Sequence, residues 1–125
     1  MRGRVLLLHG FAGSTHSWRH TGPALAAAGY EALAVDLPPY GYGARTPPEG
    51  SLSACVAALA SDRFGDAPFV AVGHSMGASV AARVAQAAGP RAAGLVLVGG
   101  GLGSGMGGGG WAARAMGVAP LARWA

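Results

Sequence analysis

A five-residue segment, GHSMG at residues 73–77, constrains the fold of this chain more than any other feature. It has the form Gly-x-Ser-x-Gly. The apolar run 68–72 precedes it, with the β-branched and aromatic residues of a buried parallel strand. Residues 78–88 follow it with the periodicity of a helix. Strand, tight turn and helix therefore occur in the order that would lift the hydroxyl of Ser75 above the edge of a sheet.

The residue types around Ser75 suit a strained turn that presents a nucleophile. Gly73 and Gly77 leave room where strand and helix approach too closely for side chains. Met76 opens the helix, so its backbone N–H can point at a developing negative charge, which the helix dipole also favours. His74 adjoins Ser75, and we expect the local geometry to turn its ring away from the hydroxyl. The alternative is an ordinary turn between a strand and a helix in a chain with 23 glycines.

The helix after the turn has a predicted polar face and a clear stop. Ser79, Arg83 and Gln86 are spaced by four and three residues, so they should share the solvent side. Gly89 can adopt the left-handed conformation that ends a helix, and Pro90 cannot continue one.

Three further segments place this turn in a familiar order. The apolar run 4–8 leads into His9, Gly10, Phe11 and a small-residue loop. Residues 30–43 read as a strand ending at Asp36 and a Gly-rich turn, and residues 94–100 as a strand. Together with GHSMG, these motifs resemble the α/β-hydrolase fold family over residues 3 to 101, where His-Gly opens the oxyanion loop. The resemblance does not identify a subfamily.

The resemblance implies a fold and a set of roles. The fold is an α/β fold, a mostly parallel sheet with helices on both faces. It would be the N-terminal part of an α/β-hydrolase core, with about four strands and three helices. A complete core of this family resembles an eight-stranded sheet. Ser75 would be the nucleophile, and the N–H groups of Phe11 and Met76 would form the oxyanion hole. The supporting residues would be His9, Gly10, Gly73, His74 and Gly77.

The catalytic acid and histidine of such a site have no counterpart after the nucleophile. No His, Asp or Glu follows Ser75, so we expect neither triad partner within this chain. His9 is better suited to holding its loop by hydrogen bonds than to acting as a base. Asp36 is better suited to forming a turn than to acting as the catalytic acid. His16 and His20 follow a Ser14/Thr15 cap and favour a surface or capping role.

The coarse layout alternates strands and helices, which predicts parallel strands with right-handed crossovers. Strands are expected at about 4–9, 30–36, 68–73 and 94–99, and helices at about 15–28, 51–62 and 76–88. Gly29 should end the first helix and Ser51 should cap the second. The ligand crevice should lie at the carboxyl ends of the strands, where Phe11 and Ser75 converge.

The C-terminal part has a different composition from the core. Nine glycines occur within residues 99–110, a stretch that costs much backbone entropy to order. We expect a core over 1–101, with 102–125 a Gly-rich linker and the start of a cap or lid. A mobile lid hinge over Ser75 is the alternative role for this stretch. Apolar residues of 111–125 could line an acyl pocket or half of an interface: Trp111, Met116, Leu121 and Trp124.

Charge and cysteine content exclude several classes of protein. The formal net charge of +4 comes from residues 67–125, which contain four arginines and no Asp or Glu. These arginines are scattered and form no basic run. This imbalance favours a missing C-terminal segment or a partner chain covering the sheet edge over a nucleic-acid or membrane patch. No run reaches the roughly 18 apolar residues of a membrane span. The single Cys55 permits no intrachain disulfide, so we expect a cytoplasmic protein. No cofactor is expected and no metal site, since His16 and His20 lack further ligands.

Our leading hypothesis is therefore a serine hydrolase that cleaves carboxylic esters or related acyl bonds of small molecules through an acyl-enzyme at Ser75. A second hypothesis is a truncated, non-catalytic fragment or binding scaffold that lacks the triad acid and histidine. Cofactor-free haloperoxidases, C–C hydrolases and thioesterases of the same fold look similar at these motifs. Epoxide hydrolases and dehalogenases of the family are disfavoured, because they place Asp where this chain has Ser75.

Overall fold

The computed structural model describes residues 1–37 and 52–99 of the 125-residue chain. Four strands alternate with three α-helices and two short 3₁₀ helices. In chain order these are β1 (Gly3–Leu8), η1 (Thr15–Trp18), α1 (Thr21–Ala27), β2 (Tyr30–Val35), α2 (Leu52–Phe64), β3 (Phe69–His74), α3 (Met76–Ala88), η2 (Gly89–Arg91) and β4 (Ala92–Val98).

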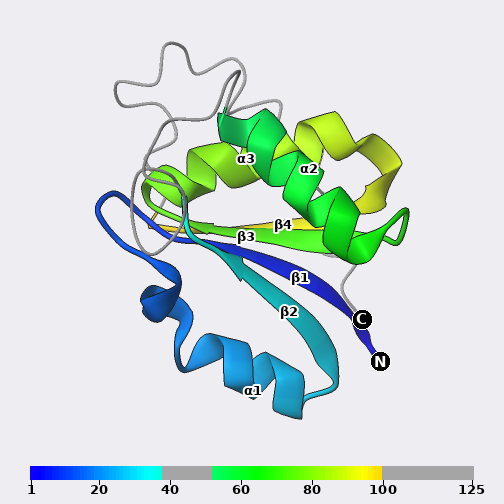
Figure 1. Cartoon of the computed structure of the whole chain (residues 1–125), viewed down its shortest axis with the longest axis horizontal. Coiled ribbons are helices and arrows are strands. Elements are labelled where there is room, and N and C mark those ends of the chain that lie inside the picture. The colour runs from blue at the N-terminus through cyan, green and yellow to red at the C-terminus, as the bar shows by residue number, and fades with distance from the viewer. Residues whose placement is uncertain (38–51, 100–125) are drawn as a thin grey trace.

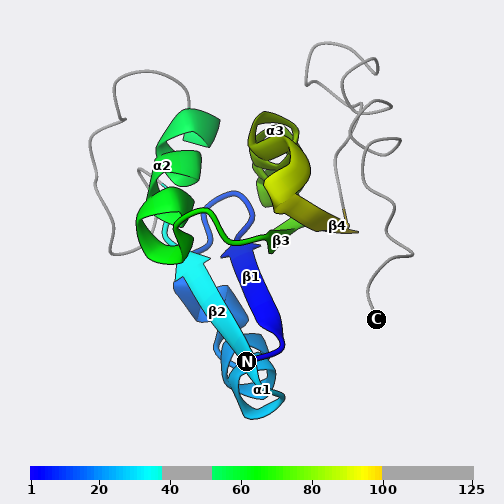
Figure 2. The ribbon, with the colours of Figure 1, turned by 90° about the vertical axis from the view of Figure 1, so that its right-hand side faces the viewer.

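The strands form one parallel sheet in the order β2-β1-β3-β4. Helices α2 and α3 cover one face and α1 covers the other, beneath β1 and β2 (Figures 1 and 2). This confirms the α/β fold class and its helices on both faces. Because the strands are parallel, the loops after β1 and β3 emerge at the same edge of the sheet, on the left in Figure 1.

The core lies between the sheet and the two helices α2 and α3. Fully buried side chains from β1, β3 and β4 contact buried residues of both helices. These include Leu6, Leu8, Phe69, Ala71 and Leu95 from the sheet, and Val56, Phe64, Val84 and Ala85 from the helices.

The exposed face of helix α3 differs from the predicted polar face at Ser79. Arg83 and Gln86 are exposed as expected, but the side chain of Ser79 is only 3% exposed. The helix packs on β3, β4 and α2 together, so its buried surface is broader than a single stripe. Ser79 is small enough to be buried there. A single apolar stripe along the helix does not account for the additional packing of α3 on α2.

The predicted helix 15–28 is two separate elements. η1 covers Thr15–Trp18 and α1 starts at Thr21, with His20 as its N-terminal flanking residue. Pro23 explains the break. It has no N–H to bond the carbonyl of Arg19, and its ring would clash with that carbonyl in a continuous helix. Gly29 follows the end of α1 with φ 93°, as expected for a residue that ends a helix.

The other boundaries differ from the expectations by two residues or fewer. β4 begins at Ala92 and α2 runs on to Phe64, while α3 has the predicted bounds. The predicted Ser51 cap, the turn after Leu37, and the Gly-rich linker and cap at 102–125 lie outside the described residues. Within 1–37 and 52–99, the helices are all too short or too polar to cross a membrane.

Candidate active site

The turn between β3 and α3 holds Ser75 in an unusual backbone conformation. Ser75 has φ 53° and ψ −115°, a region that non-glycine residues rarely adopt. Its N–H donates to the carbonyl of Val98 at 3.0 Å, and its own carbonyl accepts from Ala78 N at 3.0 Å. The strand β4 and the first turn of α3 therefore fix the Ser75 backbone from both sides. Such strain is typical of functional positions.

Gly73 and Gly77 are glycines because there is no space for a Cβ atom. A Cβ on Gly73 would overlap the carbonyl of Gly77, and one on Gly77 would overlap the carbonyls of Leu8 and His9. These neighbours are backbone atoms and cannot rotate away. The turn after β3 is therefore packed directly onto the end of β1.

The loop after β1 meets this turn at Gly10. β1 and β3 are neighbours in the sheet, although the chain passes through β2 between them, so the strand order reverses here. An ideal Cβ on Gly10 would lie 3.2 Å from Cβ of Ser75 and 3.0 Å from Nδ1 of His74. The N–H of Gly13 closes a turn on the Gly10 carbonyl at 3.0 Å, with Phe11 at its exposed tip. The site therefore lies where crevices of open parallel sheets form.

The oxyanion candidates sit on either side of this contact. Met76 is the first residue of α3, and the first N–H groups of a helix have no partner within it. Phe11 follows Gly10 directly, and its side chain is 72% exposed. The structure thus brings Gly10, Phe11, Ser75 and Met76 to one place at the carboxyl edge.

His9 is fully buried and bridges two loops. Its Nδ1 lies 2.7 Å from the Gly10 carbonyl, and its Nε2 accepts a hydrogen bond from Leu37 N at 2.8 Å. Leu37 is itself fully buried just after β2. With both ring nitrogens engaged in this way, His9 is not positioned to take a proton from Ser75.

Asp36 and the other histidines have identifiable neighbours in the structure. Asp36 Oδ1 accepts from Thr15 N at 2.7 Å, a link across 21 residues for which the sequence around Asp36 carries no local signal. His16 and His20 are exposed around η1 and α1, and Ser14 caps η1 by accepting from His16 N at 3.1 Å. The His74 ring lies beside Gly10 and also 3.8 Å from an ideal Cβ on Gly99.

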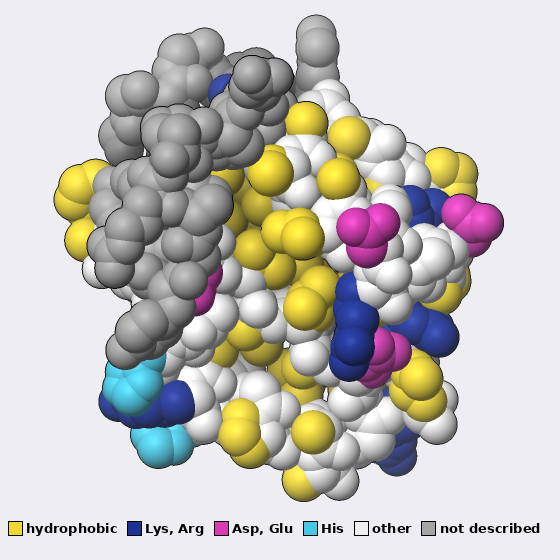
Figure 3. All heavy atoms as spheres, viewed as in Figure 1, with side chains coloured by type: hydrophobic (Ala, Val, Ile, Leu, Met, Phe, Trp, Pro, Cys, Tyr) yellow, Lys and Arg dark blue, Asp and Glu magenta, His cyan; other side chains and the backbone are white. Residues whose placement is uncertain are grey.

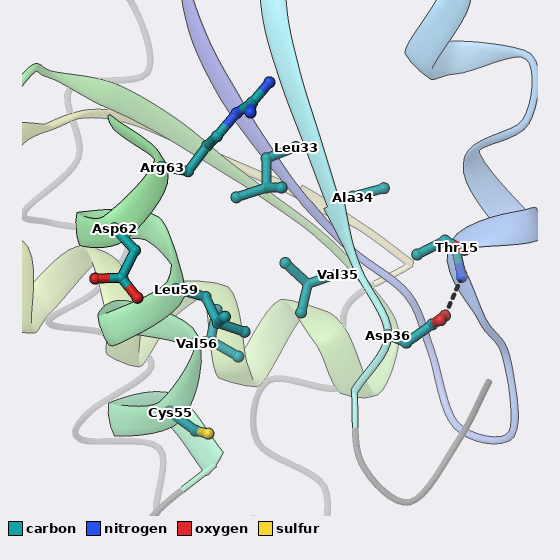
Figure 4. Close-up of a pocket in the computed structure, with 10 residues that line it drawn as sticks. All are labelled: Thr15, Leu33, Ala34, Val35, Asp36, Cys55, Val56, Leu59, Asp62 and Arg63. Carbon is teal, nitrogen blue, oxygen red and sulfur yellow. Dashed lines mark hydrogen bonds between the residues drawn. The ribbon is translucent and has the colours of Figure 1, made fainter. Parts of the chain in front are cut away.

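A mostly apolar hollow lies away from Ser75. It has a volume of about 700 Å³ and lies between β2 and α2, where Leu33, Val35 and Val56 line it (Figure 4). Hydrophobic side chains are exposed along the middle of the same face (Figure 3). Asp36 and Thr15 close one end of the hollow through their hydrogen bond. Thr15, Asp36, Cys55, Asp62 and Arg63 are the polar residues of its lining, and Ser75 is not part of it.

Metal ligands do not cluster in the described part of the chain. Residues 1–37 and 52–99 contain no group of three His, Cys, Asp or Glu side chains able to hold an ion. Cys55 lies on α2 with a free thiol.

Comparisons with known proteins agree with this geometry. The family model of the α/β hydrolase fold matches residues 3–114. Epoxide hydrolase B of Mycobacterium tuberculosis is 40% identical over 96 residues, which are 74% of this chain and 27% of that protein. The chain spans about a quarter of the length of the curated relatives it matches.

Two solved structures resemble the chain in both fold and sequence, at 32% and 30% identity. A probable hydrolytic enzyme from Pseudomonas aeruginosa PAO1 has a TM-score of 0.70 and 32% identity, covering 80% of this chain and 33% of that one. An esterase from a Rhodococcus species has a TM-score of 0.65 and 30% identity, covering 78% and 38%.

Proposed function

This chain belongs to the α/β-hydrolase fold family, and from that premise we propose that it is a serine hydrolase of carboxylic esters or related acyl bonds. Ser75 is the nucleophile, and the N–H groups of Phe11 and Met76 bind the oxyanion. The main support for this proposal is the strained backbone of Ser75 at the start of α3, close to the loop at Gly10. The closeness of Ser75, the N-terminus of α3 and the Gly10 loop supports this proposal.

The chemistry of the nucleophile decides between acyl transfer and epoxide opening. Two relatives, at 40% and 43% identity, are epoxide hydrolases, so that reaction is the natural competitor. A carboxylate that opens an epoxide forms an ester, which water can cleave in a second step. The Ser75 hydroxyl would instead form an ether, which water does not cleave under these conditions. Attack on an acyl carbon gives Ser75 an ester that can turn over.

The proposed reaction runs in two balanced steps. Ser75 Oγ attacks the acyl carbon, its proton passes to a base, and the alcohol or thiol leaves as the acyl-enzyme forms. The proton taken from Ser75 goes to the leaving alcohol or thiol. Water then attacks the same carbon, the acid leaves, and a proton from that water returns to Ser75 Oγ. Each oxyanion donor contributes about 2.7–4 kcal/mol in comparable sites. We assign no base among the described residues, because His9 Nε2 already accepts from Leu37 N.

Turnover assays on the protein expressed from its gene test this proposal. Nitrophenyl esters and acyl thioesters should be hydrolysed, and rapid quenching should trap the acyl group on the peptide that contains Ser75. Styrene oxide should not be consumed. Epoxide turnover without ester turnover would overturn the proposal. Loss of both activities, with no acyl group on Ser75, would favour a binding scaffold.

A further inference from the structure

The hydrogen bonds of His9 define which of its nitrogens carries the proton. Leu37 N can only donate, so Nε2 of His9 must hold a lone pair toward it at 2.8 Å. The Gly10 carbonyl can only accept, so Nδ1 must carry the hydrogen that it presents at 2.7 Å. The structure therefore requires a neutral imidazole with its proton on Nδ1. A ring protonated on both nitrogens would set one N–H against another in a fully buried site.

The carbonyl that His9 holds belongs to the same peptide unit as a proposed oxyanion donor. The Gly10 C=O and the Phe11 N–H are two ends of one planar group, and in a trans peptide they point in opposite directions. His9 Nδ1 and Gly13 N both donate to that carbonyl. Fixing the oxygen from this side fixes the direction of the Phe11 N–H on the other. A Cβ built on Gly10 would lie 3.2 Å from Cβ of Ser75, so the peptide lies close to the nucleophile and this direction matters there.

A second hydrogen bond secures the far end of the same loop. Thr15 N donates to Asp36 Oδ1 at 2.7 Å (Figure 4). The loop 9–15 is thus attached at both ends to residues 36 and 37, which follow β2. β2 lies on the other side of β1 from β3 and Ser75. The end of β2 therefore acts as an anchor for a loop that faces the nucleophile on the next strand but one.

We propose that His9 is a positioning residue which, as the neutral Nδ1–H tautomer, orients the Gly10–Phe11 peptide through the anchor at Leu37. The inference rests on the proposed function for its catalytic consequence, because it makes the Phe11 N–H direction depend on His9. It needs no contact between His9 and a substrate.

Two substitutions separate the two hydrogen bonds of His9. In His9→Asn the side-chain amide can donate to the Gly10 carbonyl from near the Nδ1 position, but it does not reach Leu37. In His9→Gln the longer side chain can accept from Leu37 N, but it places no donor at the Nδ1 position. His20→Asn is the matched control, since His20 is exposed at the start of α1.

The experiment combines nitrogen NMR with the reaction of Ser75 toward a fluorophosphonate. In the wild type, the imidazole nitrogen shifts should identify His9 as the Nδ1–H tautomer. The Phe11 amide resonance should move in His9→Gln but stay close to wild type in His9→Asn. Exchange of the Leu37 amide should show the opposite dependence. Labelling of Ser75 should slow roughly tenfold in His9→Gln and about threefold or less in His9→Asn. The loss is smaller than the roughly 10²–10³-fold effect of removing a donor, because the Phe11 N–H is misdirected and not deleted.

An Nε2–H tautomer, or a Phe11 resonance that moves equally in both variants, would overturn the inference. Equal slowing in both variants would also overturn it, since the carbonyl bond would then carry no special weight. If wild-type Ser75 does not react at all, the proposed function fails. In that case the His9 tautomer and the Phe11 and Leu37 amide signals still test whether His9 holds the Gly10 carbonyl and Leu37 N. If a variant does not fold, the tautomer of the wild-type protein alone provides this test.

Discussion

Two neighbouring loops at the carboxyl edge of the sheet are held by opposite means. The turn at residues 73–77 is fixed by the absence of side chains, because Gly73 and Gly77 pack directly on backbone carbonyls. The loop 9–15 is fixed by the presence of side chains, because His9 and Asp36 hold its two ends by hydrogen bonds. The first loop should therefore be most sensitive to added volume at Gly73 and Gly77. The second should be most sensitive to the loss of the polar groups that hold its ends.

The largest effect is expected from adding one methyl group to the first loop. Gly77→Ala places a Cβ on the carbonyls of Leu8 and His9, which cannot move without shifting β1. We expect a loss of about 3–5 kcal/mol in the free energy of unfolding, at the severe end for a single substitution. Urea unfolding followed by circular dichroism measures it. Gly22→Ala is the control, because no atom outside its chain neighbours lies within 4 Å of its Cβ position. Its gain in helix propensity is opposed by the restriction on a residue before proline, so its effect should be far smaller than that of Gly77→Ala.

The second prediction removes a backbone donor from the loop 9–15 without adding strain. Ala12 has φ 55° and Gly13 N bonds Gly10 O, so Phe11 occupies the second position of a type II turn, where Pro is favoured. Phe11→Pro should leave the melting temperature nearly unchanged. It should raise the activation free energy of ester hydrolysis by about 2.7–4 kcal/mol, because the N–H that binds the oxyanion is lost.

Phe11→Ala keeps the N–H and removes the exposed ring, so it is the control for that variant. If both variants lose the same activity, the ring and not the N–H of Phe11 matters, and the assignment of this oxyanion donor is wrong.

The smallest expected effect is a gain in stability at the nucleophile. Ser75→Gly removes a Cβ from a residue at φ 53°, so it should stabilise the fold by about 1 kcal/mol while abolishing the reaction. Ala12→Gly, at φ 55° in the other loop, should gain a similar amount and retain activity. Ala28→Gly has an ordinary φ of −81° and should lose stability. A destabilised Ser75→Gly would show that the turn stores no strain.

The sequence was a good guide to elements with a local signal. GHSMG, its flanking strand and helix, and the Gly29 and Gly89 stops could all be predicted, because turn geometry and periodicity depend on adjacent residues. The break before α1 has a local signal in Pro23, which the coarse prediction of one helix over 15–28 did not take into account.

The links that assemble the site could not be predicted in the same way. The bonds from His9 to Leu37 and from Thr15 to Asp36 span 28 and 21 residues. They exist because β1 and β2 pair in register, and nothing local to any of these residues specifies that partner. His9 was expected to hold its loop by hydrogen bonds, but its second partner and its tautomer follow only from the sheet.

The identity of the nucleophile is tested most directly by mapping the site of fluorophosphonate labelling. The protein expressed from its gene should be labelled on the peptide that contains Ser75, with fluoride leaving as the Oγ–P bond forms. Ser75→Ala should reduce the labelling rate at least about a thousandfold, while Ser17→Ala, an exposed serine of η1, should not change it. Labelling that persists at the wild-type rate in Ser75→Ala would contradict the assignment of Ser75.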